Sequence, residues 1–194
     1  MVAALRYKIL LGILVLSLVV SLGVNAYFYT LLVDRQAQTN NLLSRTIATW
    51  AKEMNVAGYL LQSATTNIAL SGVYSLFRTA RETASSARAY DSQTVYLYMA
   101  LTAGGVADNL FPYCVGAPIN LKYINQTAIE MFAVLYAKIQ NVTRLLDTWE
   151  LDHPKGANPM HLLEERGVVD SIIANCTDVR DYSAEISNFS PKFH

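Results

Sequence analysis

The stretch ILLGILVLSLVVSLGVNAYFYTLLV, from Ile9 to Val33, contains no charged residue and determines how the rest of the chain is organised. As a helix with a rise of about 1.5 Å per residue it would span roughly 37 Å, enough to cross a hydrocarbon core of about 30 Å. We therefore predict a transmembrane helix at residues 9–33. Tyr27, Phe28 and Tyr29 suit the interface between lipid tails and headgroups.

The same stretch allows a second interpretation, a secretory signal that is cleaved after Ala26. Val24-Asn25-Ala26 has the small residues of a cleavage site. Residues 27–33 remain strongly apolar, however, and cleavage would leave them at a new N-terminus. We favour a retained anchor and keep cleavage as the alternative.

The flanking charges predict the orientation of this helix. Arg6 and Lys8 precede it without an acidic residue, whereas Asp34 and Arg35 behind it cancel. Because positive charge stays on the cytoplasmic side, we predict a cytoplasmic segment at residues 1–8 and an extracytoplasmic domain at residues 34–194, in the cell membrane. Four acceptor sequences for N-glycosylation agree with that side and predict a glycoprotein. They begin at Asn125, Asn141, Asn175 and Asn188.

Composition limits the choice of partners. The formal net charge is zero, so the chain has no basic excess for nucleic acid. About 160 residues beyond the anchor form one ordinary domain that can bury a core. An oxidising exterior would permit a disulfide between Cys114 and Cys176, and the alternative is a buried thiol at Cys176.

Apolar periodicity predicts an all-α ectodomain, an antiparallel bundle of roughly four helices with coiled-coil-like seams. The expected helices cover about residues 34–88, 92–105, 120–152 and 159–188, the first continuous with the anchor. Ser71-Gly72 marks a candidate kink. Residues 106–119 are expected to form an irregular, rather apolar loop, because they contain two prolines and a glycine.

Two of the expected helices carry apolar residues that alternate by three and four positions. This spacing predicts a seam against another helix, either within the chain or in a partner chain. The seam residues are Leu43, Ile47, Trp50, Met54, Ala57, Leu61, Ala64 and Ile68 in the first, and Leu121, Ile124, Ala128, Met131, Leu135, Lys138, Val142, Leu145 and Trp149 in the third. The fourth expected helix has fewer large apolar residues, and its predicted packing face comprises Leu163, Val168, Ile172, Cys176, Val179, Ser183 and Ile186.

Residues that support catalysis are scarce. Glu150 and His153 have the Glu-x-x-His spacing of carboxylate-bridged metal sites, and His161 and Glu164 lie across the same predicted hairpin. The motif occurs once and at a helix end, which is more typical of a solvated turn. We predict no enzyme, no cofactor, and no catalytic or metal-binding residues, with a metal-dependent enzyme as a minor alternative.

These features predict a membrane-anchored structural or adaptor subunit that acts through protein–protein interaction with itself or with another membrane or envelope protein. The alternative is a small-molecule binding or sensory ectodomain, with Tyr96, Tyr98, Tyr136 and Trp149 as candidate pocket residues. In architecture the chain resembles the helical sensing modules of bacterial and archaeal transmembrane receptors, which implies a sensing role. Those receptors also carry a second membrane helix and a cytoplasmic output domain, for which this sequence shows no counterpart.

Overall fold

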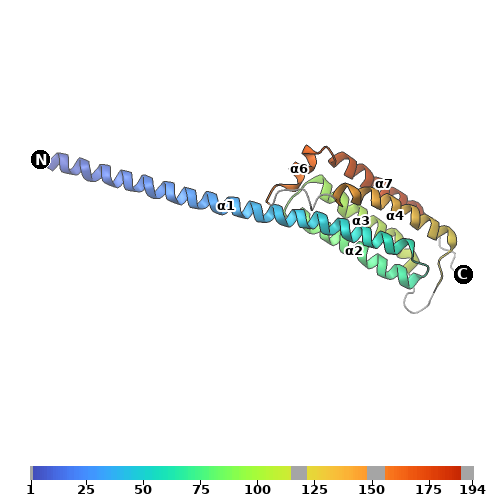
Figure 1. Cartoon of the computed structure of the whole chain (residues 1–194). Helices are drawn as coiled ribbons and strands as arrows, with labels where there is room; N and C mark the ends of the chain where they lie inside the picture. The colour runs from blue at the N-terminus through green and yellow to red at the C-terminus, as the bar shows by residue number, and fades with distance from the viewer. Residues whose placement is uncertain (1, 115–121, 148–155, 189–194) are drawn as a thin grey trace.

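The computed structural model describes residues 2–114, 122–147 and 156–188, and these residues confirm the predicted all-helical class (Figure 1). The described helices are α1 (Val2–Gln62), α2 (Asn67–Arg88), α3 (Thr94–Cys114), α4 (Gln126–Asp147), α6 (Pro159–Glu165) and α7 (Val169–Asn188). No strand occurs in this part of the chain. One isolated bridge joins Thr66 and Tyr123.

Helix α1 extends far beyond the other described helices (Figure 1). Its large apolar residues from Leu10 to Val33 are exposed except for the half-buried Leu31, and within the described chain it is the helix long and apolar enough to cross a membrane. Burial begins at Asn40. The predicted continuity of the apolar segment with the first helix of the bundle is confirmed up to Gln62.

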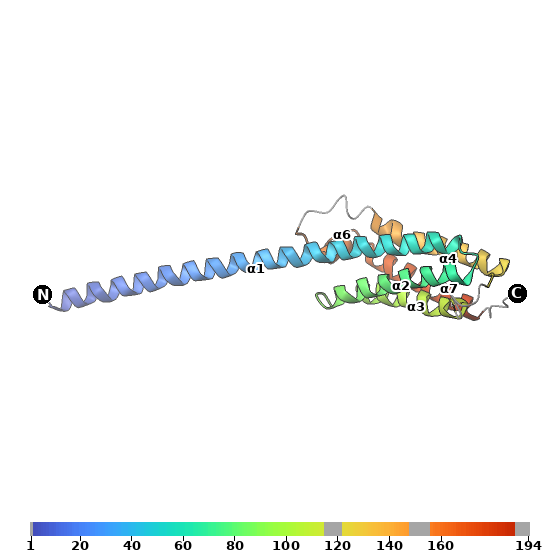
Figure 2. The ribbon, with the colours of Figure 1, turned by 90° about the horizontal axis from the view of Figure 1, so that it is seen from below.

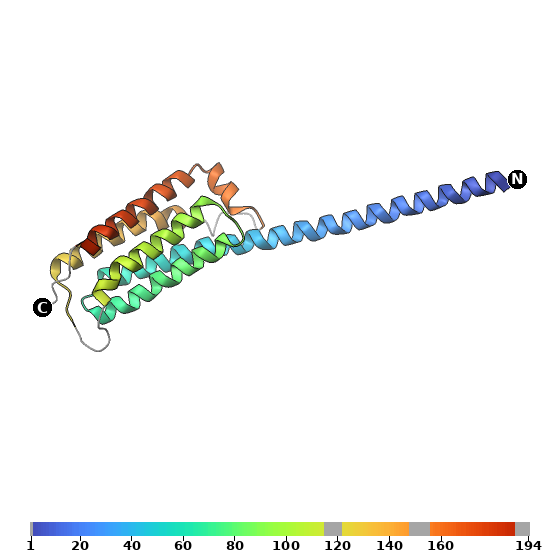
Figure 3. The ribbon, with the colours of Figure 1, turned by 180° about the vertical axis from the view of Figure 1, so that it is seen from behind.

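In the part of the chain that the structure describes, five long helices form a closed ring, one more than the roughly four that were predicted. Each long helix packs against two neighbours, in the order α1, α2, α3, α7, α4 and back to α1 (Figures 2 and 3). Successive helices in a ring can alternate in direction only if their number is even, so five helices require one parallel pair. That pair is α3 and α7.

Three hydrogen bonds fix the register of the parallel pair. Thr102 donates to the carbonyl oxygen of Cys176 at 3.0 Å, Asn109 to the hydroxyl of Ser183 at 2.8 Å, and Tyr113 to the carbonyl oxygen of Ile186 at 3.0 Å. The partners are separated by 74, 74 and 73 residues. The nearly constant separation shows that the two helices run in the same direction without slipping.

The fifth helix arises because the predicted helix at residues 34–88 is two helices. The chain leaves α1 after Gln62, and Thr66 starts α2 by accepting a hydrogen bond from the backbone N–H of Ala69. The break is stabilised by a distant segment. Asn67 exchanges hydrogen bonds with Lys122, and the N–H of Ile124 donates to the carbonyl of Thr65 at 2.9 Å. The two distal connections of the bundle are therefore paired.

The first seam packs inside the bundle. Its residues from Leu43 to Ala64 are all buried, whereas Ile68 is 44% exposed because the break moves Asn67 inward in its place. Beyond the break the buried face of α2 is Leu70, Val73, Phe77, Ala80, Ala84 and Ala87. The candidate kink at Ser71-Gly72 lies within continuous α2. The seam thus contacts helices of its own chain.

The buried face of α4 agrees with the predicted one at Ala128, Leu135 and Val142 and is shifted by one position at the other three predicted residues. Phe132, Ile139 and Leu146 are buried, and the predicted Met131 and Leu145 are only half-buried. Lys138 lies on the surface, where its ammonium group contacts the Asp178 carboxylate of α7 at 2.8 Å. Leu121 and Trp149 lie outside the described residues.

Three predicted helix boundaries were wrong. α3 continues through most of the predicted loop at 106–119, because Leu110 and Tyr113 pack in the core and Pro112 falls in its last turn. α4 begins at Gln126, where the side chain of Asn125 accepts from the N–H of Ala128. The predicted helix at 159–188 breaks at Gly167, whose φ of +66° ends α6. Of the packing face predicted for residues 159–188, Val168 is half-buried and the remaining residues are buried.

Two asparagines hold the turn before α6 against α1 at the end of the bundle nearest the apolar segment. Asn40 donates to the carbonyl oxygen of Gly156 at 2.9 Å, and Asn41 accepts from the Gly156 N–H at 2.8 Å. Gly156 has a φ of +83°, and a Cβ there would lie 3.3 Å from the Cβ of Ala37. A residue other than glycine would therefore strain this contact.

We expect Gly58→Ala to destabilise the bundle by about 1–3 kcal/mol, the usual cost of overpacking. Gly58 lies where α1 approaches α4, and a Cβ would come within 2.7 Å of the Tyr136 ring. Gly72→Ala is the matched control, because Gly72 has no such neighbour within 4 Å and alanine favours a helix by about 0.5–1 kcal/mol. Thermal unfolding followed by circular dichroism would contradict the prediction if both variants gained stability.

Candidate functional site: an arginine-lined groove on α3

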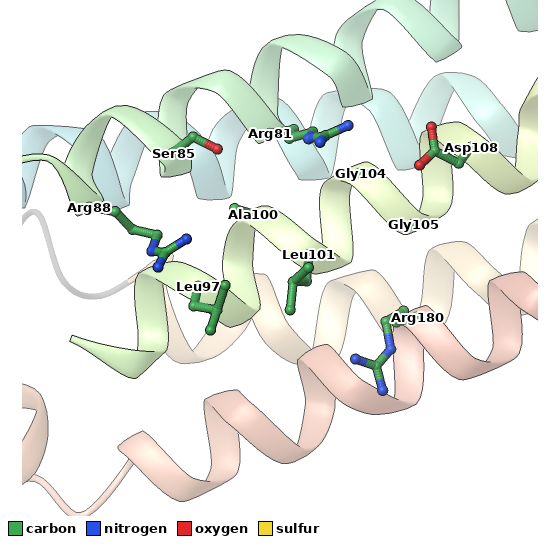
Figure 4. Close-up of a pocket in the computed structure, with 10 residues that line it drawn as sticks. All are labelled: Arg81, Ser85, Arg88, Leu97, Ala100, Leu101, Gly104, Gly105, Asp108 and Arg180. Atoms are coloured by element: carbon green, nitrogen blue, oxygen red, sulfur yellow. The ribbon is translucent and has the colours of Figure 1, made fainter. Parts of the chain in front are cut away.

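A groove of about 320 Å³ lies along the outer side of α3, between α2 and α7 (Figure 4). We call it the α3 groove. It is lined by Arg81, Ser85, Arg88, Leu97, Ala100, Leu101, Gly104, Gly105, Asp108 and Arg180. Its volume falls at the lower end of the range for small-molecule sites, about 300–1,000 Å³.

Two consecutive glycines in α3 let arginines from both neighbouring helices lie close to its backbone. A Cβ on Gly104 would lie 3.0 Å from the Cδ of Arg81, which comes from α2. A Cβ on Gly105 would lie 3.1 Å from the Cγ of Arg180, which comes from α7. Each glycine inside a helix costs about 0.5–1 kcal/mol relative to alanine. The two glycines therefore lower the stability of α3, and they leave the space that the Arg81 and Arg180 side chains occupy.

The groove concentrates positive charge in a chain whose net charge is zero. Arg81 and Arg88 form no salt bridge with the described residues, whereas Arg180 contacts the neighbouring Asp181 at 3.1 Å. Asp108, from the next turn of α3, is the acidic residue of the lining. Two guanidinium groups are thus available to an anion, and guanidinium binds carboxylate and phosphate with charge-assisted hydrogen bonds.

The two sides of the groove differ in chemistry. Arg81, Ser85 and Arg88 follow one another along one face of α2, at spacings of four and three residues. On the α3 side lie the half-buried Leu97 and the exposed Leu101, and Ala100 contributes to the floor. A ligand in this groove would meet a basic edge and an apolar edge.

Comparison with protein-family models, curated proteins and solved structures finds no match. The function is therefore argued from the geometry of the chain.

The aromatic residues expected to form a pocket do not line the α3 groove. Tyr96 is completely buried, and burial raises the pKa of its hydroxyl, which has no hydrogen-bond partner in the described structure. Tyr98 and Tyr136 are half-buried, and Tyr136 packs edge-on against Tyr59. Trp149 lies outside the described residues. Tyr96 and Tyr136 belong to the packing of the bundle.

The described residues give no support to the hypothesis of a metal site. Glu150 and His153 lie outside them. His161 contacts Glu165 at 3.1 Å, and both side chains are exposed. No group of three or more metal-ligating side chains occurs in the described segments.

Both cysteines are free thiols. Cys114 follows Tyr113, which is level with Ile186 of α7, so Cys176 lies about 15 Å away along the helix axis. A disulfide needs Cα atoms within about 7 Å. Burial raises the pKa of Cys114 to about 11 and that of Cys176 to about 12, so both thiols are protonated at neutral pH.

The four candidate glycosylation residues occupy different settings. Asn141 and Asn188 are exposed on α4 and at the end of α7. Asn175 donates its side-chain amide to the carbonyl of Ser171 at 2.8 Å, and Asn125 caps α4. Asn141 and Asn188 are therefore the more accessible positions.

Sequence reasoning missed the α3 groove, although two signals for it are present. One is Gly104-Gly105, the consecutive glycines on which the predicted helix at residues 92–105 ends. Arg81, Ser85 and Arg88 each directly follow one of the small buried residues Ala80, Ala84 and Ala87 of α2. Buried alanines at these spacings indicate that another helix packs closely against α2, and the polar residues that follow them border that contact. The sequence does not show which helix packs there.

Outside the groove, we expect Glu53→Gln to stabilise the protein at neutral pH. Burial raises the pKa of Glu53, an effect that a hydrogen bond from Thr83 partly offsets, and its Oε2 atom has no partner in the described structure. A raised carboxyl pKa means that the folded state binds more protons than the unfolded state, so stability falls as the pH rises through that range. The gain in melting temperature should therefore vanish well below the ordinary glutamate pKa of 4.5. If Glu53→Gln raised the melting temperature equally at neutral pH and well below pH 4.5, the prediction would be contradicted.

Proposed function

We propose that this protein is a single-pass membrane protein whose helical bundle lies outside the cytoplasm and binds a small anionic ligand in the α3 groove. The observation that carries the proposal is a pair of arginines, Arg81 and Arg88, that form no salt bridge with any described residue and lie beside a floor of small residues. The uninterrupted α1 supports the anchored arrangement, because it joins an exposed apolar segment directly to the bundle.

Gly104→Ala tests the site, because it fills the groove without removing a charge. We expect unchanged or slightly higher stability, since alanine favours the helix and the exposed Arg81 side chain can move away from the new methyl group. The displaced Arg81 and the smaller groove should weaken binding. Gly72→Ala, on the open side of α2, is the matched control.

The measurement is a thermal-shift screen of the full-length protein in mild detergent, with organic anions, cations and neutral compounds. A ligand that binds only the folded state at one hundred times its Kd adds about 2.7 kcal/mol of stability, a shift of several degrees for a chain of this size. We expect anions to shift the wild type and Gly72→Ala but not Gly104→Ala. If no anion shifts the wild type, or if Gly104→Ala responds equally, the groove is not the site.

Protease digestion of sealed, right-side-out membrane vesicles tests the orientation. The proposal expects residues 34–194 to be digested from outside while the N-terminal peptide is protected. Protection of the bundle in intact vesicles would overturn the extracytoplasmic placement.

The adaptor function predicted from the sequence stays a prediction. The seam at residues 43–64, which first suggested a partner, is buried against other helices of the same chain. Leu110 and Tyr113, which were expected in an apolar loop that could meet a partner, are also buried. Crosslinking in the native membrane followed by mass spectrometry tests it. Capture of a defined protein, or of a second copy, would support that function over ligand binding.

A further inference from the structure

We propose that the ligand of the α3 groove is an elongated, soluble organic dianion, with one acidic group on Arg81, the other on Arg88, and an apolar segment between them against Leu97 and Leu101. This inference rests on the proposed function and adds the chemical class of the ligand. It starts from the spacing of the two arginines on α2.

Arg81 and Arg88 are seven residues apart, which is two helical turns and about 10 Å along α2. Both border the same groove, with Ser85 between them (Figure 4). The two side chains lie at different parts of the groove, Arg88 beside Leu97 and Arg81 beside Gly104 (Figure 4), so a compact anion such as sulfate would lie against one guanidinium group in this arrangement. Two acidic groups at a similar separation can neutralise both.

The other charged residues of the lining, Arg180 and Asp108, leave Arg81 and Arg88 as the preferred pair for an anion. Arg180 already contacts the Asp181 carboxylate, which reduces its attraction for a further anion. Asp108 lies beyond Gly104, at the end of the groove away from Arg88 (Figure 4), and repels an acidic group there. The stretch from Arg81 to Arg88 is thus the part of the lining with unopposed positive charge.

The segment between the two acidic groups would lie beside Leu97, Ala100 and Leu101. These side chains offer no hydrogen bond, and across the groove Ser85 supplies a single hydroxyl, so a polar linker would recover little of the hydration that it loses. Methylene groups would instead gain from burial, at about 0.8 kcal/mol for each one fully buried. The apolar edge therefore selects a dianion with a hydrocarbon linker over a uniformly polar one.

The position of the groove separates a soluble ligand from a lipid of the same membrane. Thr83 of α2 is level with Glu53 of α1, because the two side chains are hydrogen-bonded. In the antiparallel pair Arg88 and Arg81 are then level with α1 residues near 48 and 55. These positions lie about 20–35 Å along α1 beyond Val33, farther than the headgroup of an adjacent lipid reaches.

Titration calorimetry on the full-length protein in neutral-lipid nanodiscs tests this with matched probes. Decanedioate has two carboxylates joined by a hydrocarbon chain. 10-Hydroxydecanoate has the same length and one carboxylate, and butanedioate has two carboxylates too close together. We expect decanedioate to bind about twofold to fivefold more tightly than either control probe, as suits one additional exposed charge pair.

Arg81→Gln and Arg88→Gln should each reduce decanedioate affinity to that of 10-hydroxydecanoate. Arg144→Gln removes an equivalent exposed charge from α4, on the other side of the ring, and should change nothing. Nanodiscs that contain phosphatidylserine should give the same affinity as neutral ones. Competition by the anionic lipid would overturn the soluble source and assign the site to a headgroup.

The result separates the two proposals. If decanedioate and 10-hydroxydecanoate bind equally and both depend on Arg81, the groove is an anion site and the dianion inference is wrong. If none of the probes binds, or if binding is indifferent to both arginines, the dianion inference and the α3 groove as an anion site fail together. Circular dichroism of each variant confirms that the exposed substitutions leave the fold intact.

Discussion

Trp50→Ala is expected to destabilise the bundle by about 3–5 kcal/mol, the typical cost of deleting a large buried aromatic side chain. Trp50 is 0% exposed and is the largest of the fully buried side chains. Domains of this kind are stable by about 5–15 kcal/mol, so the substitution removes a large share of the total. Denaturant unfolding of the full-length protein in mild detergent, followed by far-ultraviolet circular dichroism, measures it.

Trp50→Phe separates the contribution of packing from that of the indole N–H. The Nε1 atom of Trp50 has no hydrogen-bond partner within the described structure, and leaving a donor unpaired in the interior costs about 1–3 kcal/mol. Phenylalanine removes that donor and keeps most of the ring volume, so its cost should be less than half that of alanine. Leu42→Ala, at an exposed position of the same helix, should change stability by no more than about 0.5 kcal/mol. Equal losses for all three variants would contradict the assignment of Trp50 to the core.

The second large effect concerns the exposed apolar part of α1. Val19→Arg combined with Leu22→Arg is expected to release the protein from the membrane fraction. Each arginine near the centre of a membrane helix costs about 2.5–3.5 kcal/mol on the insertion scale, or about 5–7 kcal/mol together. Alkaline carbonate extraction of membranes, followed by immunoblotting, measures the retained fraction.

The matched control exchanges Val19→Leu and Leu22→Val, which keeps the segment apolar and should leave retention unchanged. Mass spectrometry of the N-terminal peptide adds the second outcome. A peptide that begins before Ala26 supports a retained anchor, whereas a mature terminus at Tyr27 identifies a cleaved signal. Full retention of the double arginine variant would show that residues 9–33 do not hold the protein in the membrane.

The placement of the α3 groove could not be derived from the order of elements along the chain. Arg81 comes from α2, the glycines from α3 and Arg180 from α7, and they meet only because α7 packs beside α3 in parallel. The sequence favoured antiparallel neighbours, since short connections usually produce them. Closing a ring of five helices requires the exception.

The break between α1 and α2 is the second feature that the local sequence did not reveal. Residues 63–66 contain neither glycine nor proline, and the apolar spacing continues through Ala64. What ends the helix there is pairing with residues 122–124, including the bridge between Thr66 and Tyr123. The local signal was the Thr65-Thr66-Asn67 cluster, whose side chains suit a helix N-terminus.

The sequence by itself determined the helical class, the exposed apolar segment continuous with the bundle, and most of the buried face of α1 and α7. Apolar periodicity and the absence of charge are local properties, and they specify which side of a helix avoids water. The tertiary structure decided the number of helices in the described bundle, the parallel pairing of α3 with α7, and the meeting of Arg81 and Arg180 over two glycines. Those features depend on contacts between residues far apart in the chain, whose free energies no single segment contains.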